Sequence, residues 1–229
     1  MKIAVFGTGS VGQALATRLA GLSHSVTMGT RNVETTLVRE TKDFHGTPAV
    51  AEFVTANLSI PLKSYAEAAV GAEVIVLATK GDGSQAALEA SGNIDGKIIL
   101  DISNPLDFSK GFPPTLFISN DNSLGEVLQN AFPNSHVVKT LNTMWAGLMV
   151  NPRMIEEDHT VFVSGNDAAA KATVKGILNS FGWKDSEVLD LGDITTARGS
   201  ESMLPIWLRI FGATQNGAFN FKIVAAKPA

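Results

Sequence analysis

Three glycines near the start of the chain have the spacing that a nucleotide-binding turn requires. Gly7, Gly9 and Gly12 follow a short apolar run and open a stretch with helical periodicity, in the sequence VFGTGSVG. The first glycine permits a sharp bend, the second lets a pyrophosphate approach the backbone, and the third lets helix and strand pack closely. The helix N-terminus offers N–H groups and a partial positive charge to the anion. We therefore predict that a dinucleotide is bound here by the turn, which also contains Thr8, Ser10 and Val11.

The residues about 20 positions further on indicate which dinucleotide is bound, because an NAD-selective site places an Asp or Glu there for the ribose 2′-hydroxyl. This chain instead has Thr30, Arg31 and Asn32, and its next carboxylate is Glu34. A carboxylate would repel a 2′-phosphate, whereas a guanidinium attracts one through paired hydrogen bonds. Thr30 adds a hydroxyl and Asn32 an amide. The pattern favours NADP(H); the alternative is a solvated arginine at a helix start, where a cation opposes the helix dipole.

Polar residues also follow three later apolar runs. Ala78, Thr79 and Lys80 follow one run, Asn104 follows the next, and Asn142 follows the third. Ligands of open α/β sheets lie beyond the carboxyl ends of the strands. These residues are therefore candidates for contacts with the ribose and the nicotinamide. Simple surface exposure of Lys80 and a turn role for Asn104 before a proline are equally good explanations.

The sequence offers no pattern for metal or acid–base catalysis. It has no cysteine, its four histidines are widely spaced, and it has no H-E-x-x-H segment and no P-loop. The single tyrosine, Tyr65, is followed four residues later by Ala69, so the Tyr-x-x-x-Lys pair of short-chain dehydrogenases is missing. We predict no metal site, and the catalytic residues are unknown at this stage.

The elements that must position these residues alternate along the chain. Short apolar runs predict strands over residues 3–6, 26–28, 74–78, 98–102, 137–141, 160–164 and 188–191. Helical patterns cover residues 11–22, 33–42, 167–181 and 194–219, the last bent or broken at Pro205. This alternation predicts a doubly wound α/β Rossmann fold with a parallel sheet. We place a dinucleotide-binding domain at residues 1–140 and a small C-terminal α/β part at residues 141–229.

Composition narrows the class of protein. The 229 residues are 45% hydrophobic and 17% charged, which suffices for a sizeable core. The net charge of −4 includes no dense basic patch, which argues against nucleic acid as a partner. The apolar run before Gly7 is too short for a signal peptide. The apolar stretch over residues 204–221 is interrupted by polar residues, so no membrane span is expected. We expect a cytoplasmic protein.

Seven segments, taken in order, resemble the F420-dependent NADP reductase family: VFGTGSVG, MGTRN, VIVLAT, ILDISNPL, VVKTLNT, VFVSGND and DLGDITTAR. They are also similar to the NADPH-oxidoreductase domain of the six-transmembrane metalloreductases. The resemblance covers about residues 2–210. It implies a Rossmann domain whose small C-terminal part completes a cleft over the nicotinamide, and a homodimer formed through the last helix.

The resemblance also implies roles for residues of this chain. Residues 7–12 would hold the pyrophosphate, and residues 30–32 the 2′-phosphate. Ala78 and Thr79 would line the ribose side, and Asn104 and Asn142 would border the nicotinamide. The archaeal F420 enzymes have a histidine where this chain has Asn142, which leaves the acceptor open between F420 and a flavin. The haem-carrying membrane helices of the metalloreductases do not follow in this sequence, so transmembrane electron transfer is not expected.

The leading hypothesis is an NADPH-dependent oxidoreductase that passes hydride between NADP(H) and a small flat-ring acceptor, deazaflavin F420 or a flavin. Hydride transfer between stacked rings needs orientation and a dry site more than acid–base groups. The cleft would be closed by Thr143, Trp145, Pro205 and Trp207, although packing in the core or at a dimer contact is the better explanation for both tryptophans. One alternative is a reductase of a small carbonyl or imine, which needs a proton donor. Another is a non-enzymatic NADP(H)-binding sensor.

Overall fold

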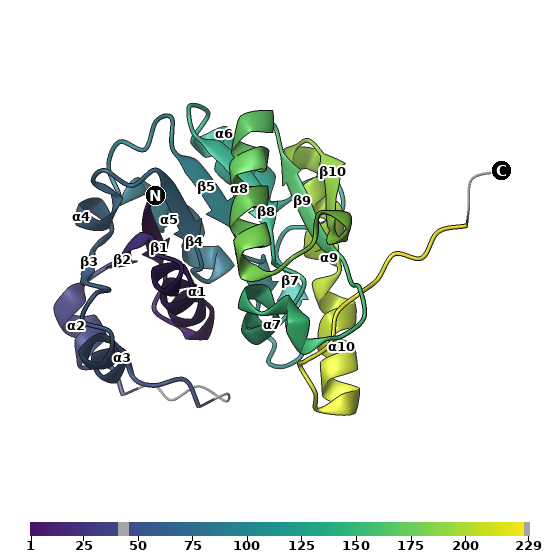
Figure 1. The fold of residues 1–229 in the computed structure, drawn as a ribbon, viewed down its shortest axis with the longest axis horizontal. Helices are drawn as coiled ribbons and strands as arrows, with labels where there is room; N and C mark the ends of the chain where they lie inside the picture. The colour runs from purple at the N-terminus through teal and green to yellow at the C-terminus, as the bar shows by residue number, and fades with distance from the viewer. Residues whose placement is uncertain (41–45, 227–229) are drawn as a thin grey trace.

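The computed structural model describes residues 1–40 and 46–226. One eight-stranded sheet runs through this part of the chain in the order β10-β9-β8-β5-β4-β1-β2-β3 (Figure 1). Its strands are β1 (Lys2–Phe6), β2 (Ser25–Thr30), β3 (Leu62–Ser64), β4 (Val74–Leu77), β5 (Ile98–Asp101), β8 (His136–Thr140), β9 (Val161–Gly165) and β10 (Val188–Gly192). A separate two-stranded hairpin consists of β6 (Leu106–Asp107) and β7 (Thr115–Leu116).

Helices cover both faces of this sheet (Figure 1). One face packs against α1 (Ser10–Gly21), α3 (Val50–Ala56), α7 (Ala146–Val150) and α8 (Ala168–Phe181). The other face packs against α4 (Tyr65–Ala69), α5 (Gly81–Glu89), α6 (Leu124–Ala131) and α9 (Ala197–Ser202). The remaining helices are α2 (Val33–Leu37), α10 (Leu204–Thr214), and the short η1 (Pro152–Met154), η2 (Asp185–Glu187) and η3 (Ile194–Thr196).

The apolar character of β1 shows why the strand needs helices on both sides. Ile3 and Val5 point into one core, while Ala4 and Phe6 point into the other, and all four are at most 2% exposed. Successive side chains of a strand point to opposite faces. A strand without polar alternation is therefore stable only when both faces are covered, which is the arrangement of doubly wound sheets.

The predicted doubly wound α/β fold is confirmed, with one strand pair that the sequence did not reveal. Strands β1, β2, β3, β4, β5 and β8 pair in parallel, but β9 pairs antiparallel with β8. The chain turns back through α7 and η1 before β9, and α8 then returns it so that β10 is parallel to β9. The sheet is therefore continuous across residue 140.

Several predicted boundaries shift in the structure. The helix expected over residues 33–42 ends as α2 at Leu37; residues 38–40 are not helical, and Lys42 lies outside the described residues. The helix expected over residues 194–219 is divided into η3, α9 and α10. Pro205 lies in the first turn of α10, where its missing N–H costs no intrahelical hydrogen bond. The short strand β3 and the β6–β7 hairpin were not predicted.

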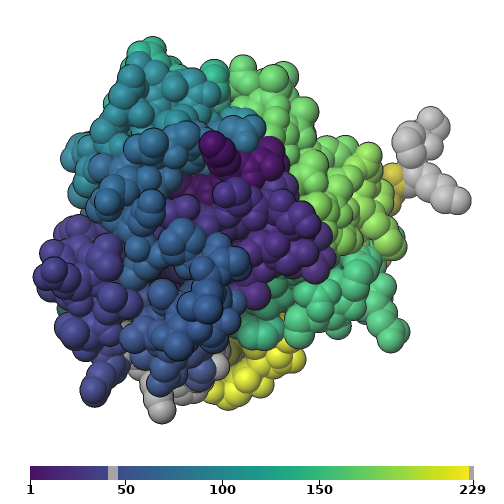
Figure 2. Space-filling model, turned by 60° about the vertical axis from the view of Figure 1, so that its left-hand side comes forward, coloured from purple at the N-terminus to yellow at the C-terminus, as the bar shows by residue number. Residues whose placement is uncertain are grey.

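The segment after α10 leads back to the sheet. The Thr160 backbone N–H donates to the Phe221 carbonyl at 2.9 Å, and Asn220 Nδ2 donates to the Thr160 carbonyl at 3.0 Å. The following residues run away from the body of the molecule (Figure 1). The space-filling view shows the purple and blue N-terminal residues side by side with the green C-terminal part (Figure 2). Among residues 1–40 and 46–226, no helix has the length and apolar character needed to cross a bilayer.

Candidate functional site

The three glycines of the first motif have different surroundings. A Cβ on Gly7, whose φ is +115°, would lie 2.4 Å from the Ala78 carbonyl oxygen, and one on Gly12 would lie 2.1 Å from the Gly7 carbonyl oxygen. Gly7 is therefore required where the turn after β1 passes the end of β4, and Gly12 where α1 passes that turn. A Cβ on Gly9 would meet no atom within 4 Å. Packing within the chain therefore does not explain Gly9. A bound pyrophosphate would fill the open space in front of it.

The start of α1 is prepared for an anion. Gly9 is the N-cap and has no side chain to cap the helix, so the first helical N–H groups keep their donor capacity. Gln13 fixes the turn, because its Nε2 donates to the Thr8 carbonyl and to the Pro48 carbonyl, both at 3.1 Å. The loop is held in place by the protein before any ligand arrives.

A cavity of about 540 Å³ lies beside this turn, and we call it the glycine-turn cavity. It joins the glycine loop to the end of β2 and to the start of α5. Its lining includes Gly7, Thr8, Gly9, Thr30, Arg31, Asn32, Ala78, Thr79 and Lys80, all of which were predicted site residues. Of the remaining predicted turn residues, Ser10 borders a different hollow with Gln13, and Gly12 is buried against Gly7.

The glycine-turn cavity carries more positive charge than Arg31 alone supplies. Arg39 lines it together with Arg31, and Arg39 Nη2 donates to Thr8 Oγ1 at 3.1 Å. Tyr65 also lines it. Burial raises the pKa of the Tyr65 hydroxyl, against the opposing effect of the two arginines. The phenol is therefore protonated at neutral pH and is a hydrogen-bond donor.

Thr30 and Asn32 also make hydrogen bonds that stabilise the local structure. Thr30 is 6% exposed, and its hydroxyl shares a 2.7 Å hydrogen bond with the hydroxyl of Thr36. Asn32 caps α2, where its Oδ1 accepts from the Thr35 N–H at 2.9 Å. The Asn32 cap orients the chain so that Arg31 and Thr35 both line the cavity.

A second cavity of about 600 Å³ adjoins the first, and we call it the tryptophan cavity because Trp207 lines it. The two cavities share Ala78, Thr79, Lys80 and Asp82, at the end of β4 and the start of α5. The rest of the wall is largely apolar and aromatic, with Val11, Phe108, Phe117, Met144, Met149 and Leu204. Phe108 and Phe117, at the β6–β7 hairpin, are 53% and 43% exposed.

Asn104 and Asn142 form one polar end of the tryptophan cavity. Asn142 Nδ2 donates to Asn104 Oδ1 at 3.0 Å, and Asn104 Nδ2 donates to the Asn142 carbonyl at 2.9 Å. Leu141, just before Asn142, has a φ of +61°, a left-handed conformation that costs a non-glycine residue on the order of 1 kcal/mol. The strained turn after β8 brings the two amides together, as the sheet-edge rule predicts.

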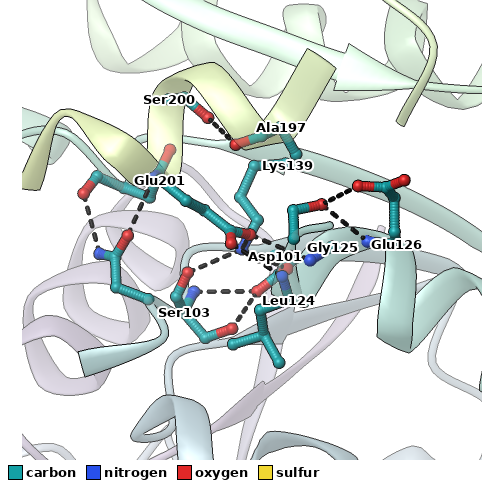
Figure 3. A network of polar contacts seen from close by, with 12 residues as sticks. Asp101, Ser103, Leu124, Gly125, Glu126, Lys139, Ala197, Ser200 and Glu201 are labelled. Atoms are coloured by element: carbon teal, nitrogen blue, oxygen red, sulfur yellow. Dashed lines mark hydrogen bonds and ion pairs between the residues drawn. The ribbon is translucent and has the colours of Figure 1, made fainter. Parts of the chain in front are cut away.

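A buried charge network lies behind this wall (Figure 3). Lys139 Nζ lies 2.6 Å from Asp101 Oδ2 and 2.9 Å from Glu201 Oε1, and it donates to the Ser103 carbonyl at 2.7 Å. The three charged side chains are at most 2% exposed. Burial alone would lower the pKa of Lys139, but Asp101 and Glu201 raise it above its ordinary value. The ammonium is therefore charged at neutral pH.

Glu201 connects this network to α6 and α9. Its two carboxylate oxygens accept from the Leu124 N–H at 2.8 Å and the Gly125 N–H at 3.0 Å, at the N-terminus of α6 (Figure 3). Leu204, which follows three residues later, lines the tryptophan cavity. The network therefore fixes the position of the segment that carries the far wall of the cavity.

The structure does not bring every predicted pocket residue to the cavity. Of the four proposed cleft residues, Trp207 lines the tryptophan cavity, and Thr143, Trp145 and Pro205 are absent from the described lining. Thr143 is buried, and Pro205 is exposed on α10. Trp145 packs over Gly147, where a Cβ would lie 2.3 Å from the indole ring. Packing against Gly147 therefore accounts for the tryptophan at position 145.

Sequence reasoning missed several lining residues. Arg39 carried a detectable signal, since it is a second arginine eight positions after Arg31. Phe108 and Phe117 lie in a segment for which the sequence predicts neither helix nor strand. Asp101 and Lys139 are charged residues in buried strands and are register partners between β5 and β8. A lysine inside an apolar run such as VVKT signals a buried partner, because an unpaired buried charge is costly.

Within the part of the chain that the structure describes, no group of three His, Asp or Glu residues is arranged to hold a metal.

Comparisons with known proteins agree with this arrangement. The family NADP oxidoreductase, coenzyme F420-dependent, matches residues 2–105. A solved structure of a proposed F420-dependent NADP reductase from Arthrobacter sp. FB24 is 53% identical, covers 98% of this chain and 100% of its own, and superposes with a TM-score of 0.92.

Two further comparisons concern proteins that are less similar. Metalloreductase STEAP3 of Rattus norvegicus is 29% identical over 212 residues, which is 90% of this chain and 38% of that protein. The chain thus spans well under half of the metalloreductase. A reductive aminase from Aspergillus terreus, solved with NADPH, has a TM-score of 0.61 at 16% identity, covering 93% of this chain and 62% of its own. This last likeness concerns the fold alone.

The resemblance predicted from the ordered motifs is confirmed, as is the prediction of an NADP-dependent enzyme. The relation to the Arthrobacter protein extends over the whole Rossmann sheet and the C-terminal part. The chain belongs to the F420-dependent family of NADP oxidoreductases.

Proposed function

We propose that the protein transfers a hydride between NADP(H) and a flat-ring acceptor, either the deazaflavin F420 or a flavin. One observation carries this proposal: a basic cavity beside a glycine turn opens into an aromatic cavity, and the two share Ala78, Thr79, Lys80 and Asp82. A dinucleotide that spans both cavities would have its phosphates among arginines and its nicotinamide among apolar side chains. The Arthrobacter relative is described as a proposed F420-dependent NADP reductase, which supports the same reaction class.

The residues present fit NADP(H). The open space at Gly9 suits the pyrophosphate, and Arg31, Arg39 and Thr35, which line the same cavity, would bind the 2′-phosphate. Asn104 and Asn142 would border the nicotinamide at the ends of β5 and β8. We assign dinucleotide binding to residues 1–140 and completion of the cleft to residues 141–229. Leu204 and Trp207, which line the tryptophan cavity from α10, support this division.

The chain's own contribution is orientation and exclusion of water. Apolar walls from Met144, Met149 and Leu204 keep a ring stack dry, and the hairpin residues Phe108 and Phe117 offer surfaces on which a flat acceptor can pack. When bound, NADPH supplies a hydride to the acceptor ring, one proton from solvent completes the reduced ring, and NADP⁺ remains. No side chain of this protein has to change its protonation state, which agrees with a wall that is mostly apolar.

The alternative reductase of a small carbonyl or imine needs a proton donor beside the substrate. Lys80 and Ser103 are among the hydrogen-bond donors that line the tryptophan cavity, and they favour this reading. The Ser103 hydroxyl already donates to Asp101 Oδ1 at 2.6 Å, which leaves Lys80 as the better candidate. The third reading, a sensor that binds NADP(H) without turnover, predicts binding without reaction.

One experiment separates these readings. The protein is mixed with NADPH, and loss of the reduced-nicotinamide absorbance is followed with F420, FMN, FAD, cyclohexanone and a cyclic imine in turn. Turnover with the ring acceptors supports the proposal. Turnover confined to the carbonyl or imine contradicts it and supports the alternative reductase. Tight NADPH binding without turnover on any member of the panel supports the sensor.

A further inference from the structure

The irregular segment after α10, which we call the C-terminal strap (residues 216–223), is held to the sheet by hydrogen bonds. Asn220 Nδ2 lies 2.7 Å from His159 Nδ1 and donates to the Thr160 carbonyl at 3.0 Å. The Thr160 backbone N–H donates in return to the Phe221 carbonyl at 2.9 Å. An irregular segment keeps one conformation only where such contacts offset the entropy lost on ordering it. Asn220 is therefore the centre of the contact that docks the strap beside the start of β9.

His159 gives the strap a fixed anchor. It is 4% exposed, its Nε2 lies 3.0 Å from the Pro152 carbonyl oxygen, and its ring packs against Trp183 with centroids 4.7 Å apart. A carbonyl oxygen only accepts and Asn220 Nδ2 only donates, so Nε2 of the histidine carries the proton and Nδ1 accepts. One neutral tautomer therefore satisfies both ring nitrogens, and Asn220 docks against a side chain that the core already holds in place.

The strap carries Phe219 to the wall of the tryptophan cavity. The Phe219 ring stacks on Trp207, with centroids 5.3 Å apart and planes 18° apart, and Trp207 lines the cavity. Phe219 also packs against Phe221 at 6.2 Å with planes 80° apart. Asn220 stands between these two phenylalanines in the sequence. Its hydrogen bonds therefore fix the ring that rests on the cavity wall.

The helix α10 needs this support, because its own side chains are incompletely buried. Figure 1 shows α10 reaching away from the sheet. Leu204 is buried at its start, but Ile206 is 51% exposed, and Trp207 and Phe211 are half-buried. A short helix owes its stability mainly to tertiary packing. Glu201, part of the buried charge network, holds the segment that leads into α10. The strap holds the other end.

We infer that Asn220 is a positioning residue for the ligand of the tryptophan cavity. It docks the strap on His159 and Thr160, and the docked strap holds Phe219 against Trp207. Within the described lining, Asn220 borders neither cavity, so it acts through these neighbours. The inference rests on the proposed function, because it takes the hydride acceptor as the ligand of the tryptophan cavity. The glycine-turn cavity takes no lining residue from α10 or the strap, so nucleotide binding there should not depend on Asn220.

The test compares steady-state turnover by the full chain with that of two variants, using NADPH and FMN, or F420 if FMN is not reduced. Asn220→Ala removes the docking amide. Asn179→Ala is the matched control, because Asn179 donates one exposed amide hydrogen bond, to Asp185. For Asn220→Ala we expect the acceptor KM to rise about tenfold, because fewer molecules have the docked wall, and the NADPH KM to stay within about twofold. Asn179→Ala should match the parent for both substrates.

A second measurement follows Trp207 without turnover. The chain has three tryptophans, so protein labelled with 5-fluorotryptophan gives few ¹⁹F resonances, and Trp207→Phe identifies the one that belongs to Trp207. Asn220→Ala should shift this resonance, because Phe219 no longer stays stacked on the indole, whereas Asn179→Ala should leave it in place. An unchanged Trp207 resonance in Asn220→Ala would overturn the inference.

The outcomes separate this inference from the proposed function. A general loss of stability would raise both KM values alike, so an equal rise for NADPH and for the acceptor contradicts a positioning role for Asn220. If the parent reduces FMN or F420 and Asn220→Ala keeps the parent's acceptor KM, the inference fails and the proposed function stands. If the parent reduces neither acceptor, the proposed function fails, while a shifted Trp207 resonance still supports the coupling of the strap to the cavity wall.

Discussion

Arg31 and Arg39 are the residues through which this protein would distinguish two nearly identical nucleotides. Both line the glycine-turn cavity, and Arg39 is tied to Thr8 of the glycine turn. A guanidinium gains paired hydrogen bonds from a phosphate but little from a ribose hydroxyl. We therefore propose that selectivity for NADP(H) depends on these two side chains, which line one cavity from the end of β2 and from the segment after α2.

Replacing Arg31 tests this selectivity. Arg31→Ala should weaken NADPH binding by about 1.5–3 kcal/mol, the range for a lost charged hydrogen bond, and leave NADH binding nearly unchanged. Titration calorimetry with both nucleotides measures the difference. Arg209→Ala, an exposed arginine on α10, is the matched control and should change neither affinity. An equal loss for NADPH and NADH would remove Arg31 from the 2′-phosphate site.

The Glu126–Arg198 ion pair makes the free energy of unfolding depend on pH. Arg198 donates to the Glu126 carboxylate at 2.5 and 2.8 Å, and this hydrogen bonding is the main reason that the pKa of Glu126 is lowered from its ordinary value of 4.5. A carboxyl with a lowered folded-state pKa contributes stability that is present above the unfolded value and is lost as the pH falls through the folded value.

Glu126→Gln isolates this contribution. We expect the variant to be less stable than the parent by about 1 kcal/mol at pH 7, the upper range for a partly exposed ion pair. The difference should begin to shrink as the pH falls below about 4.5, because Glu126 of the unfolded parent then takes up a proton, and it should be lost as the pH falls through the lowered pKa of the folded state. Urea unfolding of both proteins at pH 7, 5 and 3.5 measures it. A difference that grows towards acid pH would contradict the assignment.

At the scale of elements, charged contacts join segments that are far apart in sequence. Lys139 of β8 meets Asp101 of β5 and Glu201 of α9 in a fully buried cluster, and Glu201 also caps α6. Four elements thus depend on one ammonium group. Removing one partner of a buried ion pair is far more costly than removing the pair together, since it leaves charge without compensation.

Lys139→Met should therefore destabilise the protein by about 3–5 kcal/mol, because two buried carboxylates lose their counter-charge. Lys171→Met is the matched control, since Lys171 pairs with Asp190, a half-exposed carboxylate 2.9 Å away. The control should cost less than about 1 kcal/mol. Urea unfolding at a common pH compares the two variants. Similar losses of stability in the two variants would show that the buried cluster stabilises the fold no more than the exposed ion pair does.

At the scale of the whole molecule, the C-terminal segment presents apolar side chains to solvent. Ile206 of α10 is 51% exposed, and Ile223 and Val224 of the following segment are 57% and 84% exposed. The family resemblance implies a homodimer through the last helix, and a two-fold contact between equivalent helices would cover such residues. The homodimer remains a prediction.

Sedimentation velocity over a range of protein concentrations tests the oligomeric state. We expect a species of twice the chain mass, and Ile206→Glu should shift it towards the single chain because a carboxylate would be buried at the contact. Leu58→Glu is the control, because Leu58 is also exposed but is far from α10 in the sequence. This substitution should leave the mass unchanged. A single-chain mass at every concentration would remove the dimer.

The sequence by itself determined the local features of this protein. The glycine turn, the apolar strands and the helices over α1 and α8 depend on neighbouring residues, so spacing and periodicity predicted them. The choice of NADP(H) also came from the sequence, since Arg31 stands at a fixed distance along the chain from the glycines. These predictions hold because backbone conformation and side-chain period are set over a few residues.

Tertiary structure alone decided what depends on distant contacts. The antiparallel pairing of β9 with β8 follows from how α7 turns the chain back. Arg39, Phe108 and Phe117 joined the cavities from segments that carry no periodic signal. Trp207 rather than Trp145 lines the tryptophan cavity, because buried charges anchor the segment before α10 while Trp145 packs on Gly147. Such choices depend on the register and packing of residues far apart in sequence, which local patterns do not encode.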